Sequence, residues 1–276
     1  MARALSTEQV ALYRDQGWLS PLDFIDADEA ANARANLEAF ETEHGQLSGR
    51  PERSRAYLPF AWVDGLMRDP RLLDMVEDLI GPDILCWNAI FWIKEPATGS
   101  FVGWHQDAAY WGLDNRELVT VWLALSDASE AAGCMSVLPG SHRETMDHSE
   151  TYDKDNLLTR GQHIQDIDPA NTVAMALRAG QVSLHNIGTA HGSGANHTSD
   201  RRIGLSLHYM PTHTRQTLAD WDSAALVRGQ DRFDHFDHAP QPPADLDPAT
   251  MKYHARSAEA LRNIVYQGSN AAETKL

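Results

Sequence analysis

The segment Gly-Trp-His-Gln-Asp at 103–107 contains an imidazole and a carboxylate two residues apart. In a β-strand, side chains two residues apart point to the same side of the sheet. We therefore expect this segment to be a strand that presents His105 and Asp107 together. Two histidines and one carboxylate on one face of a metal ion, with open positions opposite, are typical of non-haem Fe(II) oxygenases. The His-X-Asp pattern alone is weak, because exposed polar strand ends have it too.

A second segment offers the missing ligand. His191 begins the Gly-rich turn His-Gly-Ser-Gly-Ala-Asn, where the backbone can approach a metal ion closely. Arg202 follows eleven residues later, and a buried guanidinium binds a carboxylate in a forked geometry. Such an arginine would hold the far end of a diacid cosubstrate. Arg201 and Arg202 point to opposite faces of their strand, and periodicity alone does not choose between them.

The chain has 13 histidines, so other ligand sets exist. His185 and His208 lie in predicted strands and can face the same cavity, but neither begins a Gly-rich turn. His235 and His238, within Asp-His-Phe-Asp-His, offer a second metal site for which we find no partner segment. We therefore expect His191 to be the distal ligand.

Together these motifs resemble the phytanoyl-CoA dioxygenase family, which includes ectoine hydroxylase and many bacterial natural-product oxygenases. The resemblance covers roughly residues 7–215 and implies a mainly β fold with helical cover, a double-stranded β-helix or jelly roll. It is carried by Trp-His-Gln-Asp at 104–107, Val-Trp-Leu-Ala-Leu at 121–125, Gly-Cys-Met-Ser-Val-Leu-Pro-Gly-Ser-His at 133–142, His-Gly-Ser-Gly-Ala-Asn at 191–196 and the arginines at 201–202.

The resemblance also implies the cofactors and the residues that bind them. Fe(II) would be held by His105, Asp107 and His191, with 2-oxoglutarate and O₂ as cosubstrates. Arg202 has the family's position for the side-chain carboxylate of 2-oxoglutarate, with Ser193 beside it. Further residues at positions that line the cosubstrate pocket in relatives are Lys94 and Trp122. The expected substrate contacts are Asn88, on the same strand face as Lys94, and Trp111, which matches a substrate-contacting tryptophan of the ectoine hydroxylase branch.

We expect a 2-oxoglutarate-dependent dioxygenase that hydroxylates an unactivated C–H bond of a small organic metabolite and releases succinate and CO₂. Asp107 favours hydroxylation over halogenation, because halogenating relatives have a small residue there that leaves room for chloride. The same cofactors also support desaturation, cyclisation or epimerisation, which the ligands do not separate. A non-catalytic jelly-roll binding module would normally lack a ligand or the arginine. A cupin-type metal isomerase or hydrolase usually has more histidines and no arginine at this spacing.

Helical patterns precede the strands that would position these residues. A capping box at Ser6 and Gln9 begins a helix that ends at Gly17, and Gly81 ends another. Helices before a central run of strands favour a β-sandwich or barrel with helical cover. The expected helices after the first are 26–43 and 70–80, and the expected strands are 84–94, 118–125, 135–138, 181–187 and 203–210.

We expect residues 1–276 to form a single domain. The family core would span about 7–215, and 216–276 would be a C-terminal wrap with a final helix near 249–266. The polar, irregular stretch 142–179 is expected to be a long insertion that acts as a lid. We expect substrate specificity to reside in three variable-looking segments, residues 44–60, 142–179 and 212–245.

The composition limits the partners. A formal net charge of −16, from 23 basic and 39 acidic residues, repels phosphate backbones and argues against nucleic acid. It also favours a small neutral or zwitterionic metabolite over an acyl-CoA. The N-terminal residues lack an apolar signal region and no stretch is apolar enough to span a membrane, so we expect a cytoplasmic protein without a membrane partner. Cys86 and Cys134 are expected to be buried free thiols. The sequence does not indicate an oligomeric state.

Overall fold

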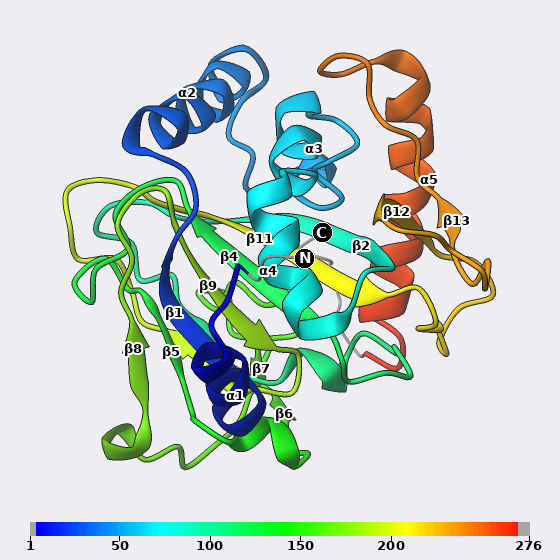
Figure 1. The fold of residues 1–276 in the computed structure, drawn as a ribbon. Coiled ribbons are helices and arrows are strands. Elements are labelled where there is room, and N and C mark those ends of the chain that lie inside the picture. Colours follow the sequence, from blue (N-terminus) through cyan, green and yellow to red (C-terminus); the bar gives the residue numbers. More distant parts are fainter. Residues whose placement is uncertain (1–3, 270–276) are drawn as a thin grey trace.

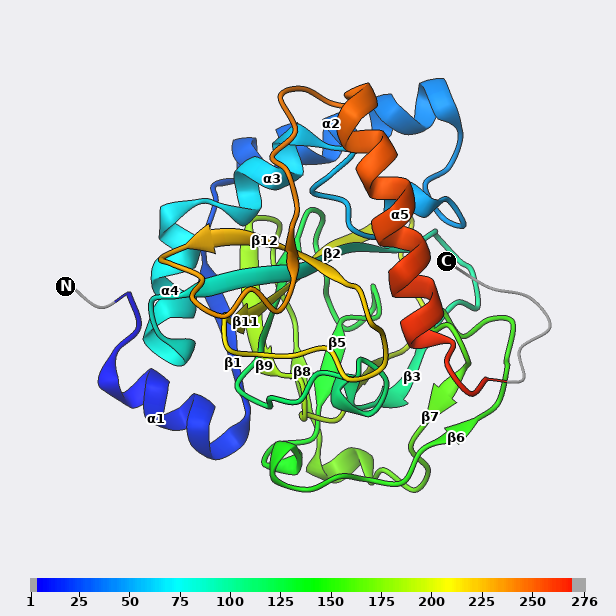
Figure 2. The same cartoon turned by 90° about the vertical axis from the view of Figure 1, so that its right-hand side faces the viewer.

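A large and a small β-sheet face each other in the computed structural model, which describes residues 4–269 (Figures 1 and 2). The predicted fold class, a mainly β jelly roll with helical cover, is confirmed. Residues 1–3 and 270–276 of the expected single domain lie outside the described residues. In spatial order the large sheet contains β1 (Trp18–Asp23), β9 (Gln181–Asn186), β4 (Val119–Ala124), β11 (Arg202–Pro211), β2 (Ile84–Lys94), β12 (Ser223–Arg228) and β13 (Asp237–His238). The small sheet contains β3 (Val102–His105), β10 (His191–Ser193), β5 (Met135–Val137) and β8 (Val173–Met175).

Both faces of the large sheet are buried, and they carry different kinds of side chain. On β11, Leu205 and Leu207 belong to the hydrophobic core, whereas Ser206 and His208 line a cavity between the two sheets. Strands β4 and β9 alternate in the same way, with Val121 in the core. Because successive side chains of a strand point to opposite faces, the apolar set packs beneath the helices while the polar set faces the cavity.

The helices cover the outer face of the large sheet. In Figure 1, α1 (Thr7–Gln16) lies beside β1, and α4 (Pro70–Ile80) crosses β4 and β11. The predicted capping box of α1 is present, and Gly17 ends the helix with a φ of 83°. The helix expected at 26–43 is α2 (Ala27–His44), which Asp26 caps. The short helix α3 (Ala61–Met67) was not predicted.

The stretch 142–179 is more regular than expected. Its last part contains β8, which pairs with β5 at the edge of the small sheet, so the expectation of a wholly irregular insertion is wrong. A three-residue edge strand is too short to give a recognisable alternation. Earlier in the stretch, β6 (Ser149–Glu150) pairs with β7 (Gln162–His163). The loop that joins these two strands forms part of the cavity wall.

The C-terminal segment adds both a strand and a helix to the fold. Strand β12 pairs with β2 in the large sheet, and α5 (Pro248–Val265) lies on the opposite side of the molecule from α1 (Figure 2). Arg160, in the loop between β6 and β7, donates to the carbonyls of Val265 at 2.7 Å and Gln267 at 2.6 Å. It also pairs with Glu150 at 2.9 Å. The loop over the cavity is thus tied to the end of α5.

The structure bears on the expected membrane segments and on the two cysteines. No helix within residues 4–269 is long and apolar enough to cross a membrane. Cys86 and Cys134 are buried free thiols, as predicted.

A buried ion pair joins the C-terminal segment to the rest of the fold. Arg55 Nη2 lies 2.6 Å from Asp222 Oδ1, and neither side chain is exposed. The indole N–H of Trp87, on β2, donates to the other carboxylate oxygen of Asp222 at 2.6 Å. The guanidinium of Arg55 also lies over the Trp87 ring, 5.0 Å from its centroid. The pair therefore supports Trp87, which lines the cavity, from behind.

Replacing Asp222 should destabilise the protein strongly. Asp222→Ala leaves the guanidinium of Arg55 buried without its partner charge, which should lower the free energy of unfolding by about 3–5 kcal/mol. The matched control is Asp74→Ala, since Asp74 pairs with Arg228 at 2.7 Å but its side chain is 52% exposed. That change should cost less than about 1 kcal/mol. Urea denaturation measures both, and similar losses would contradict a special role for the buried pair.

Candidate metal centre

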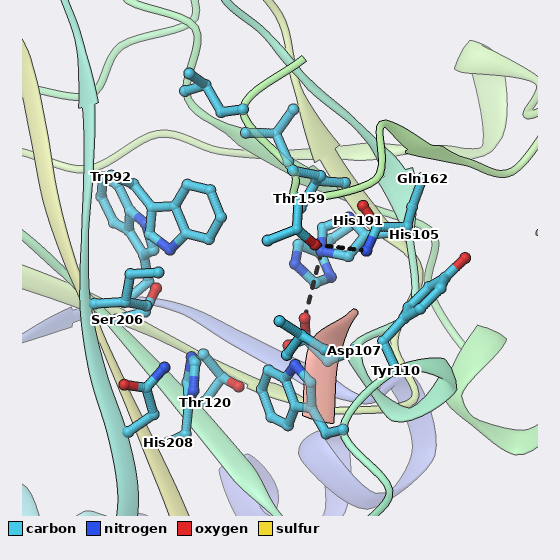
Figure 3. A pocket seen from close by; sticks show the side chains of 18 of the residues that line it. Trp92, His105, Asp107, Tyr110, Thr120, Thr159, Gln162, His191, Ser206 and His208 are labelled. Atoms are coloured by element: carbon cyan, nitrogen blue, oxygen red, sulfur yellow. Dashed lines mark hydrogen bonds and ion pairs between the residues drawn. The ribbon is translucent and has the colours of Figure 1, made fainter. Parts of the chain in front are cut away.

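Two histidines and one aspartate meet at one end of the small sheet. His191 on β10 lies directly opposite His105 on β3, with ring centroids 4.2 Å apart. Asp107 Oδ1 lies 3.3 Å from His105 Nε2. All three side chains are buried, and one ligand atom from each lies within 4.8 Å of the others (Figure 3). The structure therefore brings the three expected ligands together, although their role as ligands remains a prediction.

The expectation that His105 and Asp107 share a strand is wrong. Strand β3 ends at His105, and Asp107 begins the short 3-10 helix η2 (Asp107–Ala109). Between them, the buried side-chain amide of Gln106 donates to the carbonyl of Gly188 at 2.6 Å, which holds the turn against the loop before His191. The carboxylate therefore reaches the histidines because the chain turns, and strand alternation does not apply to it.

Backbone carbonyls orient both imidazoles. His105 Nδ1 lies 2.9 Å from the carbonyl of Gly103, and His191 Nδ1 lies 3.0 Å from the carbonyl of Thr189. A carbonyl oxygen only accepts hydrogen bonds, so Nδ1 carries the hydrogen in each ring and Nε2 keeps its lone pair. This arrangement is usual for metal-binding histidines. Two imidazole nitrogens and a carboxylate with room beside them fit Fe(II).

Electrostatics favours the ligating protonation states. Burial works to raise the pKa of Asp107, but contact with His105 and the positive charge that the nearby imidazoles carry in acid outweigh it, so this pKa lies below the usual range. Burial, together with the neighbouring His105, lowers the pKa of His191 to about 4. At neutral pH the carboxylate is ionised and His191 is neutral, as metal binding requires.

Arg202 provides a buried cation in the cavity. It is 3% exposed and its guanidinium lies over the Trp122 ring, 5.3 Å from the centroid. It has no carboxylate partner among residues 4–269, and its Nε has no hydrogen-bond partner. Burial lowers its pKa to about 10, which still leaves it charged at neutral pH. A buried, unpaired guanidinium fits a carboxylate that comes from outside the chain.

Lys94 and Ser193 lie next to this arginine. Lys94 is opposite Arg202 in the β2–β11 pairing, and its Nζ donates to Ser193 Oγ at 2.6 Å. Burial first, and then the charge of Arg202, lower the pKa of Lys94 to about 6. A pKa of about 6 leaves Lys94 mostly neutral at neutral pH, and an anion bound near Arg202 and Lys94 would favour its protonated form.

Trp122 forms one wall of this part of the cavity. A Cβ atom on Gly204 would lie 1.9 Å from the Trp122 ring, so the indole can lie flat on β11 only because residue 204 is glycine. Of the four expected cosubstrate residues, Trp122, Ser193 and Arg202 line the cavity, whereas Lys94 is fully buried and contacts it only through Ser193.

Arg201 lies on the other face of β11. It pairs with Glu41 of α2 at 2.7 Å and with Glu95 at 2.8 Å. Because these carboxylates already neutralise its charge, Arg201 is not available to a bound diacid. The structure thus places only Arg202 of the two adjacent arginines at the cavity, while its role stays a prediction.

The two expected substrate contacts also line the cavity. Asn88 Oδ1 accepts a hydrogen bond of 2.8 Å from the backbone N–H of Arg55. The Trp111 ring packs between those of Trp87, at 5.1 Å, and His208, at 4.4 Å. Their positions are compatible with substrate contact, which remains a prediction.

Sequence reasoning left other cavity residues without a role. His185 and His208 line the cavity, as we expected they could, and strand parity could also have found Ser206, which alternates with the core residues of β11 as Arg202 does. The same parity relates Thr120 to Trp122. Further strand residues that line the cavity are Ile90 and Trp92.

The three segments expected to carry specificity differ in their contribution. Segments 44–60 and 142–179 reach the cavity, whereas among the described residues that line it none belongs to 212–245. The last segment forms β12 and β13 beyond β2, so it supports the wall from outside. Helix α5 lines the cavity instead, and the residues of α5 alone could not have predicted this packing. The residues from segments 44–60 and 142–179 and from α5 are Arg53, Ser54, Leu157, Leu158, Thr159, Gln162, Leu261 and Val265.

A second acidic cluster lies on the surface. His238 Nε2 is 2.8 Å from Asp231 Oδ2, and Asp234 lies close by. His235, considered above with His238, is not part of this group. Exposed acidic groups often cluster without a metal ion, so we assign no function to it.

Comparison with known proteins agrees with this geometry. Residues 3–204 match the family described as Phytanoyl-CoA dioxygenase (PhyH). A probable alpha-ketoglutarate-dependent hypophosphite dioxygenase from Stutzerimonas stutzeri is 29% identical over 222 residues, covering 73% of this chain and 77% of the relative. The peroxisomal phytanoyl-CoA dioxygenase of Mus musculus is 25% identical, covering 74% and 68%.

A solved structure is also similar over most of the chain. The non-heme monooxygenase ThoJ, in its apo form, superimposes with a TM-score of 0.83 at 32% sequence identity. The match covers 94% of this chain and 98% of ThoJ. The relatives named above act on chemically different substrates, so their names do not supply a substrate here.

Exchanging each arginine for alanine should distinguish Arg202 from Arg201. Arg202→Ala should raise the 2-oxoglutarate concentration for half-maximal succinate release by about 30-fold to several thousand-fold, since truncating a buried charge partner costs about 2–5 kcal/mol. Arg201→Ala, the matched control, should change that concentration by less than about threefold. The measurement is succinate release over a range of 2-oxoglutarate concentrations. Equal effects of both changes would contradict the assignment.

Proposed function

The chain belongs to the phytanoyl-CoA dioxygenase family, and we propose that it hydroxylates an unactivated C–H bond of a small organic metabolite. It is an Fe(II)- and 2-oxoglutarate-dependent oxygenase, as predicted from its motifs. With the cofactors bound, 2-oxoglutarate is converted to succinate and CO₂ while one atom of O₂ is inserted into the substrate C–H bond. The observation that carries the proposal is the convergence of two carbonyl-oriented imidazoles and one ionised carboxylate at the cavity.

His105, Asp107 and His191 would hold the iron. The two histidines offer Nε2, and their Nδ1 hydrogen bonds resist rotation of the rings. Asp107 would supply one negative charge, at the position that a halide would otherwise need. Two buried histidines on paired strands and Asp107 at the start of η2 would keep this geometry fixed, which favours selective attack on a single C–H bond.

Arg202, Lys94, Ser193 and Trp122 would bind 2-oxoglutarate. Arg202 can hold its far carboxylate in a forked geometry, and Lys94 would hold Ser193 in place beside it through the hydrogen bond to Ser193 Oγ. The Trp122 ring excludes water from one side of the pair. A diacid held by Arg202 would keep its other carboxylate free for an iron ion held by His105, Asp107 and His191.

Other outcomes need the same residues. Desaturation, cyclisation and epimerisation differ from hydroxylation in what happens to the substrate after its hydrogen is removed, and that depends on how the substrate is held. Hydroxylation is favoured because the relatives named above include dioxygenases that carry out oxygenation. We also propose that the chain acts as a single domain, since β12 completes the large sheet and α5 lines the cavity.

The protein should bind iron through the buried triad. Anaerobic reconstitution should give about one Fe(II) per chain, with a weak visible band when 2-oxoglutarate is added. His191→Ala should abolish iron retention on desalting. His238→Ala, which removes the histidine of the exposed acidic cluster, should leave the iron content unchanged. Retention of iron by His191→Ala, or tight zinc binding with hydrolytic activity and no use of 2-oxoglutarate, would refute the assignment.

Asp107 should be essential for turnover. Asp107→Ala should lower substrate-dependent succinate release by more than about 100-fold, because a ligand and its negative charge are lost. Asp107→Glu keeps the charge but misplaces it, and should retain part of the activity. We do not expect Asp107→Ala to chlorinate efficiently, since chloride also needs hydrogen-bond donors around it. Near-normal turnover by Asp107→Ala would show that this carboxylate is not a ligand.

A further inference from the structure

Four polar side chains form one row across the large sheet. His185 of β9 lies opposite Thr120 of β4, Thr120 lies opposite His208 of β11, and His208 lies opposite Asn88 of β2. All four line the cavity, and their exposed fractions are 1%, 2%, 5% and 4% in this order. Thr120 and His208 are seen together in Figure 3, on the strand side of the cavity. We call these residues the polar row.

The polar row contains buried atoms without partners. Thr120 Oγ1, His208 Nδ1 and both ring nitrogens of His185 make no hydrogen bond within the protein. Asn88 accepts from the backbone of Arg55 through Oδ1, which leaves its amide N–H groups as donors for the cavity. Buried polar atoms are nearly always paired in native proteins, so such a concentration indicates a partner that comes from outside.

The row is separated from Arg202, although Trp122 lies only two residues beyond Thr120 on β4. Along β11, His208 lies six residues beyond Arg202, which corresponds to about 20 Å of strand. His185 forms the end of the row on β9, and its Nε2 is 4.0 Å from Asp107 Oδ2. The row therefore adjoins the metal centre. A diacid held by Arg202 and reaching the metal leaves the row free. The row is therefore available to the primary substrate.

The chemistry of the row selects a kind of substrate group. Two imidazoles, a hydroxyl and an amide offer several N–H and O–H donors, and Asp107 is the acidic group among the described residues that line the cavity. An oxygen acceptor fits such a set better than an ammonium group, which would need carboxylates.

Aromatic rings close this end of the cavity. Trp111 lies 4.4 Å from His208, with the ring planes 30° apart, and Trp87 lies behind both. A flat group can pack against these rings while its oxygen meets the donors. An unbranched hydrocarbon end would instead leave the polar atoms of the row buried without partners, which costs free energy.

We propose that the polar row binds a carbonyl oxygen of the primary substrate, in a carboxylate or carboxamide group, and so determines which molecules are hydroxylated. The proposal rests on the proposed function, since it concerns the second substrate of that site. Asn88 was already expected to contact substrate, and the structure adds Thr120, His185 and His208 as one continuous surface.

The first test measures stability and needs no known substrate. Thr120→Val keeps the shape of the side chain and removes its unpartnered hydroxyl. If the row exists for a ligand, the melting temperature of the iron- and 2-oxoglutarate-loaded protein should stay the same or rise. Ser183→Ala is the matched control, since Ser183 Oγ is also buried and unpartnered but Ser183 does not line the cavity. A fall of several degrees in Thr120→Val beyond that of Ser183→Ala would show a structural role and overturn the proposal.

The second test measures recognition. Succinate release is screened with small carboxylates, their primary amides, and the corresponding amines and alcohols without a carbonyl group. We expect the carboxylates or the amides to stimulate succinate release. Comparing these two sets of compounds then shows whether the acid or the amide is preferred. Thr120→Val and His208→Phe should each raise the KM for the best compound about tenfold, the effect of one lost hydrogen bond, while Ser183→Ala changes it less than about twofold.

The outcomes separate the two proposals. Stronger stimulation by compounds without a carbonyl, or equal KM values for Thr120→Val and Ser183→Ala, would overturn the role of the row while leaving the oxygenase assignment intact. A wild-type protein that binds no iron and forms no succinate from 2-oxoglutarate would instead overturn the proposed function.

Discussion

The alternation of side chains along the strands of the large sheet is the constraint on which the site depends. Both faces of the sheet are buried, so each strand must carry apolar residues toward the helices and functional residues toward the cavity. A slip of one residue would place Leu205 in the cavity and Ser206 in the core. The hydrophobic packing under α4 therefore fixes the register of β11, and with it the position of Arg202. Stability and chemistry are specified by alternate residues of the same strands.

The cavity contains buried charged groups, and a buried charge is unfavourable unless an opposite charge or a hydrogen-bond partner lies beside it. Asp107 has imidazoles beside it, whereas Arg202 and Lys94 have no carboxylate within the described residues. The chain as a whole is strongly acidic, yet this end of the cavity has an excess of positive charge. A dicarboxylate cosubstrate would offset the charge of Arg202 there. Its negative charge would also raise the pKa of Lys94, which burial and Arg202 lower to about 6.

Much of this arrangement can be read from local sequence. Capping residues and glycines predicted the ends of α1, α2 and α4 to within about one residue. Alternating runs with β-branched residues predicted the main strands. Both signals depend only on a few neighbouring residues. The metal triad was found from motif types, although the reason offered for Asp107 was wrong because Gln106 turns the chain after β3. Strand β8 and the entry of α5 into the cavity were not found, since both depend on contacts between distant segments. The sequence predicted the polar row only in part, because the pairing register between strands cannot be deduced from the residues of one strand.

The tie between Arg160 and the end of α5 has a consequence for how the enzyme is made. The cavity wall includes residues from β2, from the loop before β7 and from the last turns of α5, which are separated by most of the chain. During synthesis, the iron ligands emerge well before the helix that shields them. The cavity is therefore enclosed only after α5 has been synthesised and has packed against the rest of its wall.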